Sequence, residues 1–257
     1  MEIDWNVVKK MTLWNYEDLI DKILKVLSHK FIQDYYHHNM KEAGIYVKEL
    51  LGYNKKYQKS IIRMTNVFKR LDSLRVENYT DLVYKVETRE KCEEFVRKTN
   101  LPFQDLIYAL NYIFRWVLPF RNVYLRQLVD DDNEAHMDHI KRLREHDIKL
   151  NLDILEHGRT KKGREKLSME TGISKAFILD LVNRADLTRL PYMSKKTVIH
   201  LCNAGYDTIN KLATVDVERL KQDMKSYFDE MGIRLGSFID ITGLVMWAKA
   251  IPKIVEI

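Results

Sequence analysis

The chain has 257 residues, 46% of them apolar and 31% charged, which is typical of a soluble globular protein with one or two domains. Only 9 glycines and 4 prolines occur, too few for the many turns of an all-β protein, so we expect an all-α fold. The net charge of +6 and the pI near 9.0 permit nucleic acid or another acidic partner without requiring one.

The sequence favours a cytoplasmic protein. Cys92 and Cys202 are too few and too far apart for a disulfide framework or a cysteine-based zinc site. The first residues include acids and lack the apolar run of a signal peptide. The most apolar stretch, residues 237–251, is interrupted by Asp240 and Lys249 and is too short to cross a bilayer. We therefore expect no membrane partner.

Residues 1–52 carry the apolar spacing of a helix that needs a packing partner. One face of that helix collects five aliphatic side chains: Leu19, Ile20, Ile23, Leu24 and Leu27. Further along, Gly44 stands between Ala43 and Ile45, the order of residues that ends a helix in a left-handed glycine followed by an apolar side chain. We therefore predict a tight turn at Gly44.

A second helix is predicted over residues 57–71, with two distinct faces. Its apolar face carries Ile61, Met64, Phe68 and Leu71, and its opposite face carries Lys59, Arg63, Asn66 and Arg70. No acid occurs between Lys55 and Arg70. Two interpretations are open: a solvated basic face, or a stripe that follows the phosphates of a nucleic acid.

The chain contains an internal repeat, seen when it is aligned with itself at an offset of 72 residues. Identities without a gap include Lys69-Arg70-Leu71 with Lys141-Arg142-Leu143, Asp81 with Asp153, Thr88 with Thr160, Asn111 with Asn183, and Leu118-Pro119 with Leu190-Pro191. The acidic residues 129–138 separate the two copies. We predict an N-terminal helical domain over 1–132 with a diverged first unit, and a second domain over 133–257.

Residues 171–213 are short helices joined by tight turns. Gly172 and Gly205 are each followed by an apolar residue and then by Ser174 or Asp207, which we expect to cap the next helix. A shorter helix pair is predicted at the end, over 217–227 and 238–250, with Gly232 in the turn between them and Pro252 as the stop.

Residues 190–213, LPYMSKKTVIHLCNAGYDTINKLA, resemble the helix-hairpin-helix units of DNA repair and polymerase proteins. Over residues 140–255 the chain is more similar to a bacterial and archaeal helix-hairpin-helix-like family of unknown function. Sequence features that carry this similarity are Gly163-Arg164, Thr171-Gly172-Ile173, Val182-Asn183-Arg184-Ala185-Asp186-Leu187, Ala204-Gly205 and Trp247-Ala248-Lys249. The resemblance implies a fold of tandem hairpin units and, by analogy with the repair proteins, contact with DNA.

One departure from that resemblance concerns the hairpin loop. The related loops hold two glycines that let the backbone approach a phosphate, whereas this loop is Pro191-Tyr192-Met193-Ser194, in which Tyr192 and Met193 would crowd the approach. Backbone amides and the ammonium groups of Lys195 and Lys196 would still be able to meet a phosphate. A phosphate-binding hairpin and a purely structural hairpin both remain open.

Motifs for catalysis or metal binding are weak. Residues 158–163 have the glycine spacing of a phosphate-binding loop but continue with Arg164-Glu165 in place of Lys-Ser/Thr, so we expect only a basic helix start. His136 and His139 form a single i, i+3 pair, short of a metal site. The aromatic segment 108–120 fits core packing better than base stacking. We expect no cofactor, no metal and no catalytic residue.

The sequence therefore predicts an all-α, non-enzymatic protein that binds DNA or RNA through phosphate contacts with little sequence preference. The residues predicted to make these contacts are Lys55, Lys59, Arg63, Arg70, Arg159, Lys161, Lys162, Arg164, Lys195 and Lys196. The rival interpretation is a scaffold that binds a protein partner or a second copy of itself. An enzyme with a site assembled from distant residues is the third and weakest alternative.

Overall fold

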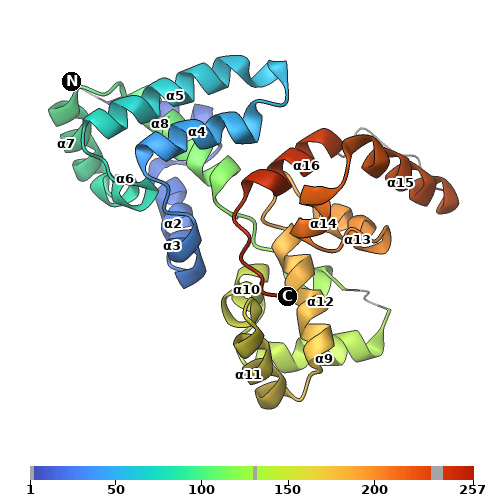
Figure 1. Ribbon diagram of the computed structural model, residues 1–257. Helices are drawn as coiled ribbons and strands as arrows, with labels where there is room; N and C mark the ends of the chain where they lie inside the picture. Colours follow the sequence, from blue (N-terminus) through green and yellow to red (C-terminus); the bar gives the residue numbers. More distant parts are fainter. Residues whose placement is uncertain (1–2, 130–131, 233–239) are drawn as a thin grey trace. The chain divides into compact units, whose positions relative to one another are not determined.

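All regular elements that the computed structural model describes, over residues 3–129, 132–232 and 240–257, are helices. Within these ranges the extended backbone pairs only as two isolated bridges, Asn39 with Asn78 and Tyr124 with Leu150. The all-α prediction is confirmed. The helices form two compact units, Met1–Phe120 and Arg121–Ile257 (Figure 1). We describe each unit by itself; the boundary predicted near residue 132 stays a prediction.

Unit 1 is built from eight α-helices and two short irregular turns within the described residues. They are α1 (Asn6–Thr12), α2 (Tyr16–Leu27), α3 (Lys30–Tyr35), α4 (Met40–Leu51), the 3-10 turn η1 (Lys55–Tyr57), α5 (Gln58–Ser73), α6 (Tyr79–Lys85), α7 (Arg89–Thr99), α8 (Phe103–Tyr112) and the π-turn η2 (Ile113–Val117). Helices α4 and α5 lie side by side (Figure 1) and α2 packs against α3 and α6. The predicted apolar face of residues 57–71 is buried as expected.

Unit 2 contains the remaining described helices. They are the 3-10 turn η3 (Leu125–Gln127), α9 (Glu134–Glu145), α10 (Asn151–Gly158), α11 (Lys161–Thr171), α12 (Lys175–Leu187), α13 (Lys195–Asn203), α14 (Ile209–Thr214), α15 (Val217–Glu230) and α16 (Ile241–Ala250). Helix α12 packs against α10 and α11, and α14 packs against α16. The predicted final helix pair corresponds to α15 and α16; Ile233 and Phe238 lie outside the described residues.

Helices α5 to α8 of unit 1 recur as α9 to α12 of unit 2. Adding 72 to the bounds of α7 (Arg89–Thr99) gives the bounds of α11 (Lys161–Thr171), and the same offset carries the starts of α6 and α8 onto those of α10 and α12. The sequence repeat is therefore a repeat of helix boundaries.

The turns of the repeat also coincide. Arg75 and Asp147 both have left-handed backbones, with φ of 58° and 60°. The residue after each donates its amide back to the end of the preceding helix, Val76 to Leu71 at 3.1 Å and Ile148 to the carbonyl of Leu143 at 3.0 Å. Because both copies make the same turn, the similarity extends to the backbone path between the helices.

A second turn of the repeat joins α7 to α8 and α11 to α12. Its left-handed residue is Asn100 in unit 1, with φ of 54°, and Gly172 in unit 2, with φ of 69°. In unit 2 the buried Ile173 follows, and the Ser174 hydroxyl then accepts the amide of Phe177, as the sequence predicted. A glycine and an asparagine occupy this position because both tolerate a left-handed backbone.

The structure corrects two predicted turns. Gly44 lies inside α4 rather than at a turn, because a capping box between Asn39 and Glu42 starts that helix and its buried face packs on α5 through Gly44 and beyond. Those contacts outweigh the roughly 1 kcal/mol that a glycine costs within a helix. At the other turn Gly205 is left-handed as predicted, but Thr208 caps α14 and Asp207 pairs instead with Lys211.

Candidate nucleic-acid interface

The basic residues predicted in unit 1 divide into lysines that are free of ion pairs with the described residues and arginines that are engaged. Lys55 and Lys59 are exposed at the start of α5. Arg63 pairs with Asp105 at 2.8 Å and its guanidinium lies 4.1 Å from the ring centroid of Tyr108. Arg70 donates to the carbonyl of Asn100 at 2.5 Å. The two arginines therefore connect α5 to the helices beside it and are less suited to binding phosphate.

Aromatic side chains accompany the free lysines at the turn between α4 and α5. The ring of Tyr57 lies 5.4 Å from that of Trp116 and 6.0 Å from that of Tyr53, both in edge-on geometry. The ammonium of Lys56 lies 4.7 Å from the centroid of the same Tyr57 ring. We call Tyr53, Lys55, Lys56, Tyr57, Lys59 and Trp116 the aromatic–lysine patch.

Sequence reasoning identified only part of this patch. The prediction places Trp116 in the core with the rest of segment 108–120, and eight other members of that segment are indeed buried: Ala109, Leu110, Tyr112, Ile113, Phe114, Val117, Leu118 and Pro119. Trp116 is half-buried and belongs to the π-turn η2, where the helix register changes. A period of 3.6 residues cannot anticipate such a change, so the contact with Tyr57 had no signal in the sequence.

The basic start of α11 in unit 2 is largely occupied by the chain itself. Arg164 is only 6% exposed and donates to the carbonyls of Gly158, Arg159 and Glu256, the last at 2.6 Å. The carboxylate of Glu256 accepts the backbone amide of Lys161 at 2.9 Å. A carboxylate therefore stands at the helix start where a phosphate would otherwise bind.

Only the lysines of that segment point to solvent. Arg159 donates to the carbonyl of Glu156 at 2.9 Å, whereas Lys161 and Lys162 have exposed side chains. Helix α10 precedes the segment, so the strand that a nucleotide-binding loop requires is not there. Two of the four basic residues predicted here, Arg159 and Arg164, thus have internal roles.

The α12–α13 hairpin presents the other predicted lysines. Tyr192 has a left-handed backbone, with φ of 58°, and is 52% exposed, whereas Met193 is 2% exposed and faces the core. The expectation that Met193 would crowd a phosphate is therefore wrong. Ser194 caps α13 by accepting the amide of Thr197, and Lys195 and Lys196 are exposed. Neither lysine is paired with a carboxylate among the described residues.

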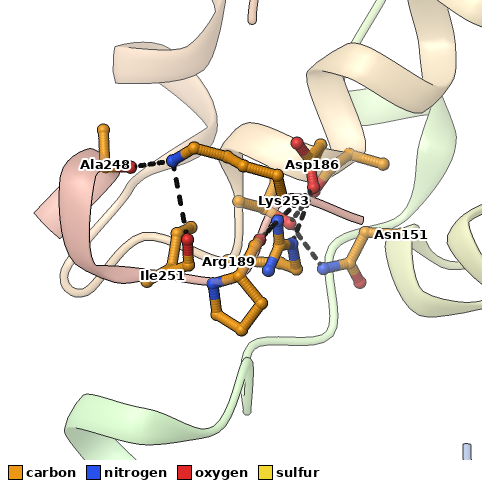
Figure 2. Close-up of polar contacts among 9 residues, drawn as sticks. Asn151, Asp186, Arg189, Ala248, Ile251 and Lys253 are labelled. Atoms are coloured by element: carbon orange, nitrogen blue, oxygen red, sulfur yellow. Dashed lines mark hydrogen bonds and ion pairs between the residues drawn. The ribbon is translucent and has the colours of Figure 1, made fainter. Parts of the chain in front are cut away.

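Behind the hairpin, a buried ion pair fixes the end of α12. The side chains of Asp186 and Arg189 are 7% and 0% exposed and lie 2.6 Å apart (Figure 2). Arg189 also donates to the carbonyl of Pro252 at 3.0 Å, which ties the C-terminal segment to α12. Burial raises the pKa of Asp186, and the neighbouring guanidinium opposes that rise.

The residues around this pair serve structure. Lys253 extends away from Asp186 to donate to the carbonyl of Ala248, and Asn151 donates to the hydroxyl of Thr188 at 2.7 Å (Figure 2). A shallow pocket of about 290 Å³, including its open mouth, lies beside Asp186 and the C-terminal segment. Both charged groups on its wall already have partners, so the arrangement anchors the chain end rather than offering a reactive group.

The histidine pair of α9 packs against an aromatic ring. The ring centroids of His136 and His139 lie 5.3 and 4.6 Å from that of Phe177. In the described part of the chain no group of three or more histidine, cysteine or acidic side chains is arranged to hold a metal ion. Nor does any described helix combine the length and the apolar character needed to span a membrane.

Comparison with known proteins identifies one related family. Residues 134–249 match the model of a domain of unknown function (DUF4332), just under half of the chain and all within unit 2. No curated protein and no solved structure matches the chain. The matched range overlaps most of residues 140–255, where the sequence resembles a family of unknown function, and it adds no activity, substrate or partner.

Proposed function

We propose that the protein is a non-enzymatic nucleic-acid-binding protein whose α12–α13 hairpin contacts backbone phosphates. The observation that supports this best is the pair Lys195 and Lys196 on the first turn of α13, which are exposed and have no carboxylate partner among the residues that the structure describes. The Ser194 hydroxyl accepts the amide of Thr197 and hydrogen-bonds the Thr197 hydroxyl at 2.7 Å, so in the described part of the chain it caps neither the amide of Lys195 nor that of Lys196. Amides of the first helical turn have no acceptor within the helix. Free amides and two ammonium groups at one helix start form a site suited to a phosphate.

The backbone of the hairpin supports a relationship to helix-hairpin-helix units. The left-handed Tyr192 takes a conformation that glycine adopts most readily, the buried Met193 follows it, and Ser194 caps the second helix. The loop therefore follows a backbone path that glycine would adopt without strain, and here the strain falls on Tyr192. Of the two loop residues Tyr192 and Met193, Met193 faces the core, so Tyr192 is the one whose side chain would lie near a bound phosphate.

The test measures affinity for nucleic acid as a function of salt. Fluorescence anisotropy with a labelled 20-base-pair duplex is recorded from about 50 to 200 mM salt, for the wild-type protein and for Lys195→Gln/Lys196→Gln. Each lost phosphate contact lowers the slope of log affinity against log salt by about 0.9, so the double variant is expected to lose about 2 in slope. The control is Lys22→Gln/Lys25→Gln, which removes the same charge from exposed positions on α2.

Two results would overturn the proposal: no binding at about 50 mM salt, or affinity that survives unchanged at several times that concentration. Light scattering that reveals a self-associated species, together with the absence of a duplex complex, would favour the rival scaffold function. An unaltered salt slope in Lys195→Gln/Lys196→Gln would move the contact away from the hairpin.

A further inference from the structure

We infer that the aromatic–lysine patch of unit 1 is a stacking platform for single-stranded nucleic acid. This inference rests on the proposed function and specifies a second site with its own class of ligand. Three half-buried rings, those of Tyr53, Tyr57 and Trp116, meet at the turn where three exposed lysines begin α5. In a single strand the rings can stack on the bases, and the ammonium groups can bind the phosphates.

The two chain segments that carry the patch are basic. Residues 50–71, which form the turn and most of α5, contain six lysines or arginines and no acid. Residues 106–120, which form most of α8 and the turn that carries Trp116, also contain no acid. Asp105, just before the second of these segments, is already paired with Arg63 at 2.8 Å. Among the described residues, none of Lys55, Lys56 and Lys59 forms an ion pair with a carboxylate.

The rings of the patch are ordered by contacts with one another and with Lys56. Tyr57 touches Trp116 edge-on, with an interplanar angle of 80°, and Lys56 covers part of the same ring. Trp116 belongs to a π-turn, an uncommon element that concentrates at functional sites. Because the rings are already ordered, a base that stacks on them loses less entropy of the protein than it would on mobile side chains.

Single strands are favoured over duplex for a geometric reason. Within a duplex the flat faces of the bases are stacked on one another, so a ring at the protein surface can reach only the sugar–phosphate backbone. An unpaired strand exposes those faces, and each stacked base contributes through its π-face whatever its identity. DNA and RNA share this chemistry, and the affinities for (dT)20 and (U)20 distinguish between them.

The experiment compares labelled (dT)20, (U)20 and a 20-base-pair duplex by anisotropy on the full chain. We expect the preferred single strand to bind about tenfold more tightly than the duplex, the effect of one stacked base. Tyr57→Leu should weaken single-strand binding about tenfold while leaving the duplex within about twofold. Lys55→Gln/Lys59→Gln removes two exposed charges, leaves the contact between Lys56 and Tyr57 in place, and should lower the salt slope for single strands by about 2.

A second readout is tryptophan fluorescence, which a stacked base quenches. Saturating (dT)20 should quench the wild-type protein and should quench Trp116→Phe much less. Equal affinity for all three ligands, with no effect of Tyr57→Leu or of Lys55→Gln/Lys59→Gln, would overturn the inference. In that case a loss of duplex binding in Lys195→Gln/Lys196→Gln would leave the hairpin proposal standing, whereas no binding of any ligand would overturn both.

Discussion

The two copies of the repeat are covered by opposite ends of the chain. In unit 1 the hydroxyl of Tyr16, on α2, donates to the carbonyl of Val86 at the end of α6. The equivalent carbonyl in unit 2 is that of Gly158, 72 residues later, and it accepts from Arg164 at 3.1 Å. Arg164 in turn donates to Glu256 of the C-terminal segment.

A second pair of contacts shows the same equivalence. Arg89, the first residue of α7, pairs with Glu17 on α2, and this contact lowers the pKa of the Glu17 carboxyl. Lys161, the first residue of α11, donates its amide to Glu256. One repeated frame is thus completed by a helix before it in one unit and by an extended segment after it in the other. The comparison shows that, in both copies, polar groups at this end of the repeat bind residues from a different part of the chain.

The interiors of the two copies differ where this cover attaches. Asp186 and Arg189 of unit 2 correspond, at the offset of 72, to Phe114 and Val117 of unit 1, which are buried and apolar. In unit 2 the ion pair binds the C-terminal segment through Arg189, whereas the equivalent positions of unit 1 are filled by buried apolar side chains.

Removal of Asp186 should have the largest effect. Asp186→Ala leaves Arg189 buried without its partner and should lower the free energy of unfolding by about 3–5 kcal/mol. Asp186→Phe/Arg189→Val installs the pair found in unit 1 and should be less destabilising than the single change. Urea denaturation measures both, with Asp180→Ala, whose carboxylate pairs with Arg184 near the surface, as the control. A double variant less stable than Asp186→Ala would contradict the comparison.

Arg164 and Tyr16 serve equivalent carbonyls with different numbers of hydrogen bonds. Arg164→Leu removes donors from three carbonyls and should cost about 2–3 kcal/mol, whereas Tyr16→Phe removes one and should cost about 1 kcal/mol. Thermal and urea unfolding provide the measurement. Lys166→Ala, at an exposed position on the same helix as Arg164, is the control and should change stability little. An equal loss of unfolding free energy in Arg164→Leu and Tyr16→Phe would contradict the different numbers of hydrogen bonds given to the two side chains.

Each unit also has a histidine whose pKa is lowered by burial, His38 in unit 1 and His200 in unit 2. Because the unfolded chain binds protons more readily than the folded one, the free energy of unfolding should fall as pH falls through 6.5, the ordinary histidine pKa. Each histidine contributes a slope of at most about 1.4 kcal/mol per pH unit. His38→Gln should reduce the slope in urea titrations between pH 7 and 5, and a slope unchanged by this substitution would contradict the assignment.

The smallest effect is expected at the left-handed turn of the repeat. Gly172→Ala forces a side chain into a backbone with φ of 69° and should cost about 1 kcal/mol. Asn100→Gly, at the equivalent position, should change stability by less than about 0.5 kcal/mol because asparagine already tolerates this conformation. Thermal unfolding distinguishes the two, and a neutral Gly172→Ala would show that the turn relaxes.

Much of the helical frame was predictable from local sequence signals. The turn at Gly172 follows from a glycine, an apolar residue and a capping serine, each acting within a few residues of the others. Gly44 shows the limit of such signals, since the same pattern lies within α4 where packing on α5 and a capping box prevail. Asp207 shows the same limit. Asp207 and Thr208 are adjacent and both have an oxygen side chain that can cap a helix, and the structure has Thr208 as the cap of α14.

The candidate site was less predictable than the frame. Exposed lysines such as Lys195 and Lys196 follow from the helix period. That Arg63 meets Asp105 depends on contacts across 42 residues, and that Arg164 meets Glu256 depends on contacts across 92. Charge runs in the sequence carry no information about such partners. Trp116 joined the candidate surface only because a π-turn changed its register.

The sequence by itself determined the helices, the all-α class and the repeat of 72 residues, because periodicity, caps and left-handed turns act over short distances. The tertiary structure alone decided which charges are used internally. Arg159, Arg164 and Arg189 all bind backbone carbonyls, and two of these carbonyls belong to the last six residues. Which cation stays exposed for a ligand depends on the carbonyls and carboxylates that folding brings beside it, and these come from distant parts of the chain.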